Sequence, residues 1–183
     1  MTDIVTIRRM TADDAELVTA WRHEPSAARY QPLHAYPVDR QRAMLARRAE
    51  MPIAPDAGGK LQWMALHDDI PAGWVSLDIT SREHQTGSIG YLVGEAFRGR
   101  RIAPRALALV IPIAFDPAQL DLARLEANVA VENIASQRVL EGNGFRREGT
   151  LRGLLNIGGV RVDHYRYGLL RADLPRMDVL ASE

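Results

Sequence analysis

Hydrophobic residues alternate with polar or small residues in several separate stretches of the chain. In the middle of the chain, Ile89, Tyr91 and Val93 stand at every second position. A period of two is typical of a β-strand, because successive side chains of a strand point to opposite faces of its sheet. The pattern predicts strands over residues 4–7, 61–66, 72–79, 88–93, 124–129, 145–156 and 160–170.

Two helices are expected before the middle of the chain. Thr11 is followed by an acid three residues later, which is typical of the start of a helix. The apolar residues after it fit one helical face as far as residue 21. Residues 37–50 repeat this pattern with arginines on the outer face. Both helices are therefore expected to bury one face and expose the other.

Two further helices are expected in the second half. One begins near Pro104, which suits a first helical turn because its missing N–H would have no partner there. Pro112 lies inside the same pattern and predicts a kink or an early end. Asn133 caps the other helix, which is expected to stop at Asn143-Gly144 in a left-handed turn.

The turn between the strand at 88–93 and the helix after it carries an unusual amount of positive charge. Arg98, Arg100, Arg101 and Arg105 lie within eight residues, with Gly99 among them. The first N–H groups of a helix have no intrahelical partner, and the helix dipole adds positive potential there. The turn therefore predicts a site for a phosphate or pyrophosphate. The alternative is a turn whose arginines are simply solvated.

Two common phosphate-binding motifs are excluded at this turn. No Lys-Ser or Lys-Thr closes it, so it is not a P-loop. It also lacks G-x-G-x-x-G and does not follow the first strand of the chain, which disfavours a dinucleotide-binding fold. The anion site needs another explanation.

Two motifs resemble those of the GNAT N-acetyltransferase superfamily. Residues 98–103, RGRRIA, resemble its acetyl-coenzyme A signature [Q/R]-x-x-G-x-[G/A]. Residues 133–145, NIASQRVLEGNGF, resemble N-x-x-S-x-x-v-l-x-x-x-G-F of the branch that acetylates ribosomal proteins on alanine. The likeness extends over about residues 7–170 in the order of elements. One position departs from the signature, because its first Gly is Arg101 here.

The resemblance implies an α/β (α+β) architecture, the GNAT fold. Its sheet is mixed, mostly antiparallel and twisted, with about seven strands and helices on both faces. The strands at 88–93 and 124–129 would splay apart and admit the pantetheine arm of coenzyme A. The residues that the resemblance assigns to the cofactor are Tyr91, Leu92, Val93, Arg98, Gly99, Arg100, Arg101, Ile102, Ala103 and Asn133.

Acetyl transfer from a thioester to an amine requires a neutral amine, donors for the oxyanion, and a proton or other stabilisation for the thiolate. Many family members protonate the thiolate with a Tyr at the position of Leu140 here, so that acid is missing. In the ribosomal-protein branch a Ser has this role, and Ser136 stands at the matching place. The alternative is that Ser136 only satisfies the first turn of its helix.

The general base is less clear. The branch often carries an acid where this chain has Leu155, so Glu126, on a polar strand face, is the first substitute. The other interpretation of Glu126 is a solvated charge. His34, His84 and His164 could titrate near neutral pH, but no spacing singles one of them out. No His/Asp/Glu spacing suggests a metal site.

The composition of the chain restricts the classes of protein to which it can belong. The chain has 183 residues, 46% of them hydrophobic and 25% charged, with a formal net charge of zero and no cysteine. We expect a single domain over residues 1–171 followed by a tail at 172–183. A nucleic-acid partner is disfavoured without a dominant basic surface. No apolar stretch spans a membrane and no signal peptide is visible, so a cytoplasmic location is expected.

The combined hypothesis is an acetyl-coenzyme A-dependent N-acetyltransferase acting by direct attack of the amine in a ternary complex. Its partners would be the coenzyme A donor and an amine acceptor, either a protein N-terminus or a small molecule, and a homodimer stays open. The alternatives are a drug-modifying acetyltransferase or a non-catalytic coenzyme A sensor or assembly module. A weaker one is an RNA-binding module that uses the arginines.

Overall fold

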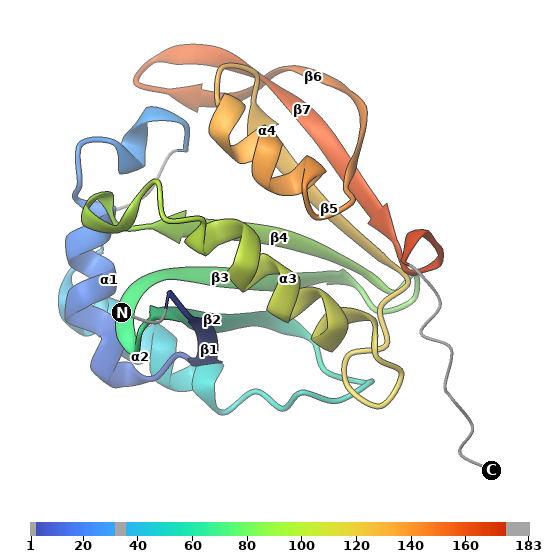
Figure 1. The fold of residues 1–183 in the computed structure, drawn as a ribbon, viewed down its shortest axis with the longest axis horizontal. Helices are drawn as coiled ribbons and strands as arrows, with labels where there is room; N and C mark the ends of the chain where they lie inside the picture. Colours follow the sequence, from blue (N-terminus) through green and yellow to red (C-terminus); the bar gives the residue numbers. More distant parts are fainter. Residues whose placement is uncertain (1–2, 32–35, 175–183) are drawn as a thin grey trace.

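The structure is a computed structural model that describes residues 3–31 and 36–174. Within these residues seven strands form one sheet in the order β1-β2-β3-β4-β5-β7-β6 (Figure 1). Their pairing is mixed and mostly antiparallel, which confirms the expected fold class. The strands are β1 (Val5–Arg9), β2 (Gly59–His67), β3 (Ile70–Ser81), β4 (Thr86–Val93), β5 (Arg124–Ala130), β6 (Arg146–Ile157) and β7 (Val160–Leu170).

The sheet consists of two antiparallel parts that meet at one parallel pair. β1 to β4 are antiparallel neighbours, and β5, β7 and β6 form the second antiparallel part. The two parts join where β4 lies parallel to β5. β6 and β7 form a hairpin whose turn is Gly158-Gly159, and both glycines have positive φ, at 60° and 88°. Its two long strands extend along one side of the molecule (Figure 1).

Four α-helices lie on this sheet within the described residues: α1 (Ala15–Arg22), α2 (Val38–Ala49), α3 (Ile102–Phe115) and α4 (Ile134–Glu141). Short 3-10 turns lie at Ala12–Asp14, Ala27–Arg29, Glu95–Phe97 and Arg171–Asp173. Figure 1 shows α3 over β3 and β4, and α4 over the second part of the sheet. None of the helices in the described part of the chain is long and apolar enough to cross a bilayer.

Alternation along β4 divides the apolar residues between two cores. Ile89, Tyr91 and Val93 pack with α3 in the larger core, whereas Leu92 packs with α1 and α2 in the smaller one. Since neighbouring strand residues point to opposite faces, the two cores lie on opposite faces of the sheet. This arrangement confirms the expected helices on both faces. Tyr91 accordingly points to the face that carries α3 and α4.

Of the two outcomes predicted at Pro112, the early end is wrong, because α3 continues to Phe115, and the kink stays a prediction. Pro112 removes only one helical hydrogen bond, and its own carbonyl still accepts a bond of 2.9 Å from the Asp116 N–H. The buried Ala114 and Phe115 hold the last turn against the core. The predicted tail begins inside the turn at Arg171–Asp173, and most of it, residues 175–183, lies outside the described residues. The single domain stays a prediction.

Candidate active site

β4 and β5 are neighbours in the sheet, but they pair over a short distance only. Residues 86–88 of β4 lie beside residues 124–126 of β5, and the two strands then separate. β4 continues to Val93 beside β3, and β5 continues to Ala130 beside β7. An opening therefore widens between β4 and β5, and each of the two strands stays paired with its other neighbour in the sheet. This is the separation expected between these strands.

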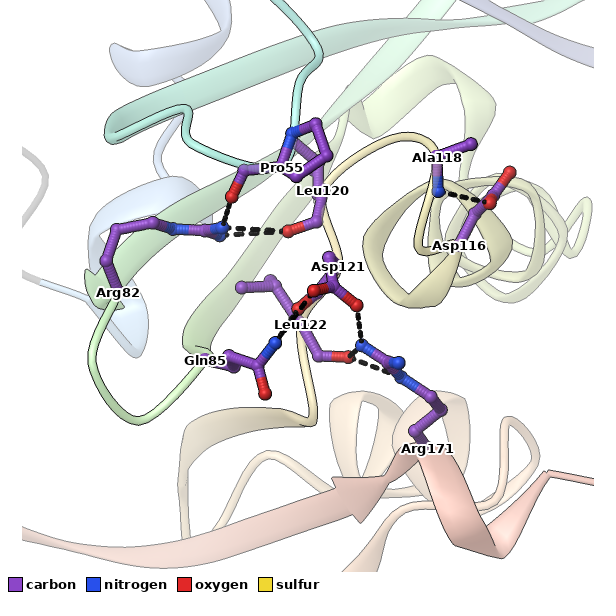
Figure 2. A network of polar contacts seen from close by, with 9 residues as sticks. All are labelled: Pro55, Arg82, Gln85, Asp116, Ala118, Leu120, Asp121, Leu122 and Arg171. Carbon is purple, nitrogen blue, oxygen red and sulfur yellow. Dashed lines mark hydrogen bonds and ion pairs between the residues drawn. The ribbon is translucent and has the colours of Figure 1, made fainter.

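The closed end of the opening is fastened by polar side chains (Figure 2). The Gln85 amide donates to the backbone and side chain of Asp121, at 2.8 and 2.9 Å. Arg171 pairs with the same Asp121 carboxylate at 2.7 Å and also donates to the Leu122 carbonyl. Arg82 donates to the Leu120 carbonyl at 2.9 Å. These bonds tie the start of β4 to the start of β5, so the opening has a fixed apex.

The turn after β4 leads to an unusual helix start. Gly99 has a φ of 78°, and Arg101, the residue before α3, has φ 55° and ψ 27°. Both values lie in the left-handed region, which glycine tolerates far better than other residues. The signature's Gly is therefore explained by backbone conformation, and this chain adopts the same conformation with Arg101. No described side chain caps α3, so its first N–H groups face the opening.

α4 begins on the other side of the opening and is capped. The Asn133 side chain accepts a hydrogen bond from the Ser136 N–H at 3.2 Å, as predicted for a helix cap. The Tyr91 hydroxyl of β4 reaches across to the same residue, at 2.6 Å from Ser136 Oγ and 3.0 Å from its carbonyl oxygen. Burial raises the pKa of Tyr91, so its hydroxyl stays protonated at neutral pH.

A pocket of about 650 Å³ occupies this opening. The described residues that line it include four arginines and no carboxylate, so they give it a positive potential. An anionic ligand with an extended, uncharged arm fits such a lining. The lining residues are Ser26, Ala27, Arg29, Tyr30, Gln31, Tyr91, Leu92, Val93, Phe97, Arg98, Gly99, Arg101, Ile102, Ala103, Pro104, Asn133, Ala135, Ser136, Arg138 and Val139.

The segment after α1 forms one wall of the pocket and is tied to the turn after β4. The Glu24 carboxylate accepts from the Glu95 N–H at 3.1 Å, and the Glu95 carboxylate accepts from the Ser26 N–H at 3.1 Å. Beside this contact, Trp21 packs on Gly94, where a Cβ atom would lie only 2.5 Å from the indole nitrogen. The end of β4 therefore needs glycine for packing rather than for a positive φ.

The structure brings together nine of the ten residues assigned to the cofactor. The tenth, Arg100, does not line the pocket, and its guanidinium lies 5.7 Å from the centre of the Phe97 ring. It lines a second hollow of about 340 Å³ on the other side of the turn, which also includes Arg105. Arg105 is held there by Asp3 at 3.0 Å. Of the four arginines of this turn, Arg98 and Arg101 line the pocket, and Arg101 also borders the second hollow.

Glu126 does not line the pocket. Its carboxylate forms an ion pair of 2.7 Å with Arg166 and lies 3.6 Å from Arg124. It also stands opposite Ser88, at the closed end of the opening. The structure therefore separates the two catalytic candidates, with Ser136 in the pocket and Glu126 in an ion-pair cluster on the sheet.

The other candidates for the base are not gathered at the pocket either. His84 is exposed on the turn before β4, and Leu155 lies on β6 beside Val162. His164 is buried on β7, its Nδ1 lies 2.9 Å from the Val162 carbonyl, and Nε2 has no partner among the described residues. His34 lies outside the described residues. No group of three potential metal ligands occurs in the part of the chain that the structure describes.

Sequence reasoning missed the contribution of three side chains. It assigned Tyr91 to the cofactor and gave its hydroxyl no role, although alternation with Ile89 already places the ring on the face that meets the helices. Arg138 follows Ser136 by two residues inside the second motif, and only the structure shows that it lines the pocket. Arg29 lies in a connection without periodicity, so no sequence signal could have found it.

Comparison with known proteins gives a family match over most of the chain. The model described as "Acetyltransferase (GNAT) domain" matches residues 5–146. The probable N-acetyltransferase YjcK of Bacillus subtilis is 41% identical over 107 residues, which are 58% of this chain and 58% of that protein. The chain thus spans little more than half the length of this curated relative.

Solved structures give the same fold. The ribosomal-protein-S5-alanine acetyltransferase of Vibrio fischeri superimposes with a TM-score of 0.79 at 21% identity, covering 93% of this chain and 95% of that one. The spermidine N-acetyltransferase of Vibrio cholerae, solved with CoA and spermine, superimposes with a TM-score of 0.80 at 18% identity. That match covers 92% of this chain and 96% of the other. At these identities the likeness concerns the fold alone.

Proposed function

Because the chain belongs to the GNAT acetyltransferase family, we propose that it transfers the acetyl group of acetyl-coenzyme A to an amine by direct attack, with both substrates bound together. The match confirms the family that the two motifs predict, and it supports the enzyme class, an N-acyltransferase. We also propose where the donor binds, which class of acceptor is used and what individual residues do.

The pocket is the observation that carries this proposal. The first N–H groups of α3 and the side chains of Arg98 and Arg101 would hold the pyrophosphate, since both supply positive potential at one end of the pocket. The apolar part of the pocket, between β4 and α4, would take the pantetheine arm. Backbone groups of β4 from Tyr91 to Val93 would bind its amides, because β5 no longer pairs with them. The thioester would then lie near Ser136.

The lining also favours one class of acceptor. No carboxylate or imidazole is among the described residues that line the pocket, so none of these side chains can take a proton from a strongly basic amine. An α-amine has a pKa of roughly 7.7–8.0, against about 10.4 for a lysine side chain, so a useful fraction of it is neutral without a base. The arginines would also repel a polycation. We therefore propose a protein or peptide N-terminus, or a small monoamine, as acceptor.

The test is release of coenzyme A from acetyl-coenzyme A in the presence of matched acceptors. One peptide carries a free α-amine and no lysine, and its partner carries a blocked α-amine and one lysine. Spermidine and an amine-bearing antibiotic complete the panel. Turnover with the first peptide alone, rising with pH up to the pKa of its own amine, is the expected result. Preference for spermidine or the lysine peptide would contradict the proposed acceptor.

A second candidate function is a coenzyme A sensor that binds without turnover. The specific observation in its favour is that no base is among the described residues that line the pocket, whereas Glu126 is held in an ion pair with Arg166. The acceptor panel separates the two functions. A sensor would bind acetyl-coenzyme A and release no coenzyme A with any amine, whereas the enzyme would release it with at least one.

A further inference from the structure

The two hydroxyl groups of Tyr91 and Ser136 meet across the opening of the sheet. Their oxygens are 2.6 Å apart, which is a short distance even for an O–H···O bond. Tyr91 comes from β4 and Ser136 from the first turn of α4, and both line the pocket. This contact therefore joins the two sides of the opening at the place where the thioester would lie.

The geometry limits where the two hydroxyl protons can go. Tyr91 has one proton, which it can donate either to Ser136 Oγ or to the Ser136 carbonyl, 3.0 Å away. That carbonyl lies inside α4, where the N–H four residues later is its normal partner. The shorter distance and the unoccupied lone pairs of Ser136 Oγ favour Oγ as the acceptor of the Tyr91 proton. In this arrangement Ser136 keeps its own proton for another acceptor, whereas in the reverse arrangement Ser136 donates to the Tyr91 oxygen and Tyr91 donates to the carbonyl.

We propose that Tyr91 is the positioning residue of the reaction, and that its hydroxyl fixes Ser136 so that the Ser136 O–H points at the sulfur of the thioester. The inference rests on the proposed function, since it assumes that a thioester occupies the pocket. It gives the side chain of Tyr91 a role through Ser136, and it accounts for a proton donor at the sulfur although Leu140 replaces the tyrosine common in the family.

The chemical step balances with these groups. The amine nitrogen forms a bond to the acetyl carbon, and the carbon–sulfur bond breaks with its electron pair going to sulfur. Sulfur takes a proton from Ser136 Oγ, and the nitrogen loses one proton to water. Ser136 regains its proton from water, so Tyr91 is unchanged at the end. Its raised pKa suits a group that donates a hydrogen bond and keeps its proton.

Tyr167 provides a matched control. Its hydroxyl also binds α4 from a strand, donating to the Glu141 carboxylate at 2.8 Å, but at the C-terminal end of the helix and outside the pocket. Burial raises its pKa to about 12, so it too is a permanent donor. Tyr91→Phe and Tyr167→Phe each remove one hydroxyl bond between the sheet and α4. Only the first removes the bond to Ser136.

The test measures the pKa of the coenzyme A thiol bound to the protein, using the ultraviolet absorbance of the thiolate. The chain has no cysteine, so the ligand carries the only thiol, and spectra without coenzyme A remove the tyrosine signal. A hydrogen bond donated to the thiolate lowers this pKa. We expect Tyr91→Phe to raise it by up to about one unit, and Ser136→Ala by at least as much. The double variant should match Ser136→Ala, and Tyr167→Phe should match the wild type.

Coenzyme A affinity and the free energy of unfolding are measured on the same four variants. The inference is supported if Tyr91→Phe binds coenzyme A as tightly as the wild type but has a raised thiol pKa. Its turnover should then fall in proportion to the rise in that pKa. A thiol pKa in Tyr91→Phe equal to that of the wild type would overturn it while leaving the proposed function in place. A shift in Tyr167→Phe as large as in Tyr91→Phe would also overturn it, because any loosening of α4 would then suffice. No coenzyme A binding to the wild type would overturn the proposed function itself.

Discussion

The N-termini of α3 and α4 line the same pocket, but they are built in opposite ways. α3 begins after Arg101 in a left-handed conformation, with no described side chain on its first N–H groups. α4 begins after Asn133, whose side chain binds the Ser136 N–H. The first helix start is open toward the pocket and the second is closed by its own cap.

Because of this difference, we expect the two helix starts to have different roles in the site. An open helix start with nearby arginines binds an anion, because its N–H groups and dipole are unused. A capped start has used its N–H groups, and what it offers to the pocket is a side chain, Ser136, held by Tyr91. We therefore predict that substitutions at the start of α3 alter the affinity for coenzyme A, and that substitutions at the start of α4 alter turnover.

The largest effect is expected from Ser136→Ala. Loss of a positioned proton donor should lower kcat by roughly a hundredfold, which is the lower range for general acid catalysis. The affinity for coenzyme A should change little, because the Asn133 cap binds the backbone of residue 136. Steady-state kinetics and calorimetry check this together. A large loss of affinity at unchanged kcat would reverse the assignment of the two helices.

The next effect is expected from the double variant Arg98→Ala with Arg101→Ala. Removing two charges at the open start of α3 should weaken coenzyme A binding by roughly tenfold to a hundredfold. Turnover at saturating donor should stay close to that of the wild type. Arg152→Ala, which removes an exposed arginine from β6, serves as control. Equal affinity of the double variant and this control would show that the phosphate site lies elsewhere.

A smaller effect is expected from Asn133→Ala. Loss of the cap leaves the Ser136 N–H without its partner and should lower the free energy of unfolding by about 1 kcal/mol. Chemical denaturation measures this, with the exposed Asn156→Ala of β6 as control. If both alanine variants unfold at the same denaturant concentration, the cap contributes nothing and α4 is held by other contacts.

The smallest effect is expected from Arg101→Gly compared with Arg101→Ala. Both variants remove the charge, but only glycine adopts the left-handed conformation without strain, so it should be more stable than alanine by about 1 kcal/mol. Thermal unfolding measures the difference. An alanine variant as stable as the glycine variant would mean that the left-handed conformation at residue 101 is not strained.

Much of the fold follows from the sequence pattern, because strands and caps depend on local chemistry. The alternation around Tyr91 and the cap at Asn133 belong to this class. The continuation of α3 past Pro112 could not be predicted in this way, because it depends on the burial of Phe115 in the core. The site divides in the same way. The arginine-rich turn is visible in the sequence, whereas the contact between Tyr91 and Ser136 depends on how far β4 and β5 separate.

Glu126 illustrates a further limit. A polar face on a strand indicates that a carboxylate is accessible, but it does not tell which cation lies beside it. In the structure Arg166, forty residues later in the chain, takes that place. Arg101 is the opposite case. Its departure from the signature was visible at once, and only its φ of 55° shows that the backbone conformation survives the change.

The most direct test of the central claim is a calorimetric titration of the wild-type protein with acetyl-coenzyme A, with dephospho-coenzyme A and ATP as comparison ligands. The account predicts saturable binding of acetyl-coenzyme A, and binding of the comparison ligands that is clearly weaker. No binding of acetyl-coenzyme A, or equal binding of all three, would contradict it, since the pocket between α3 and α4 would not then be a coenzyme A site.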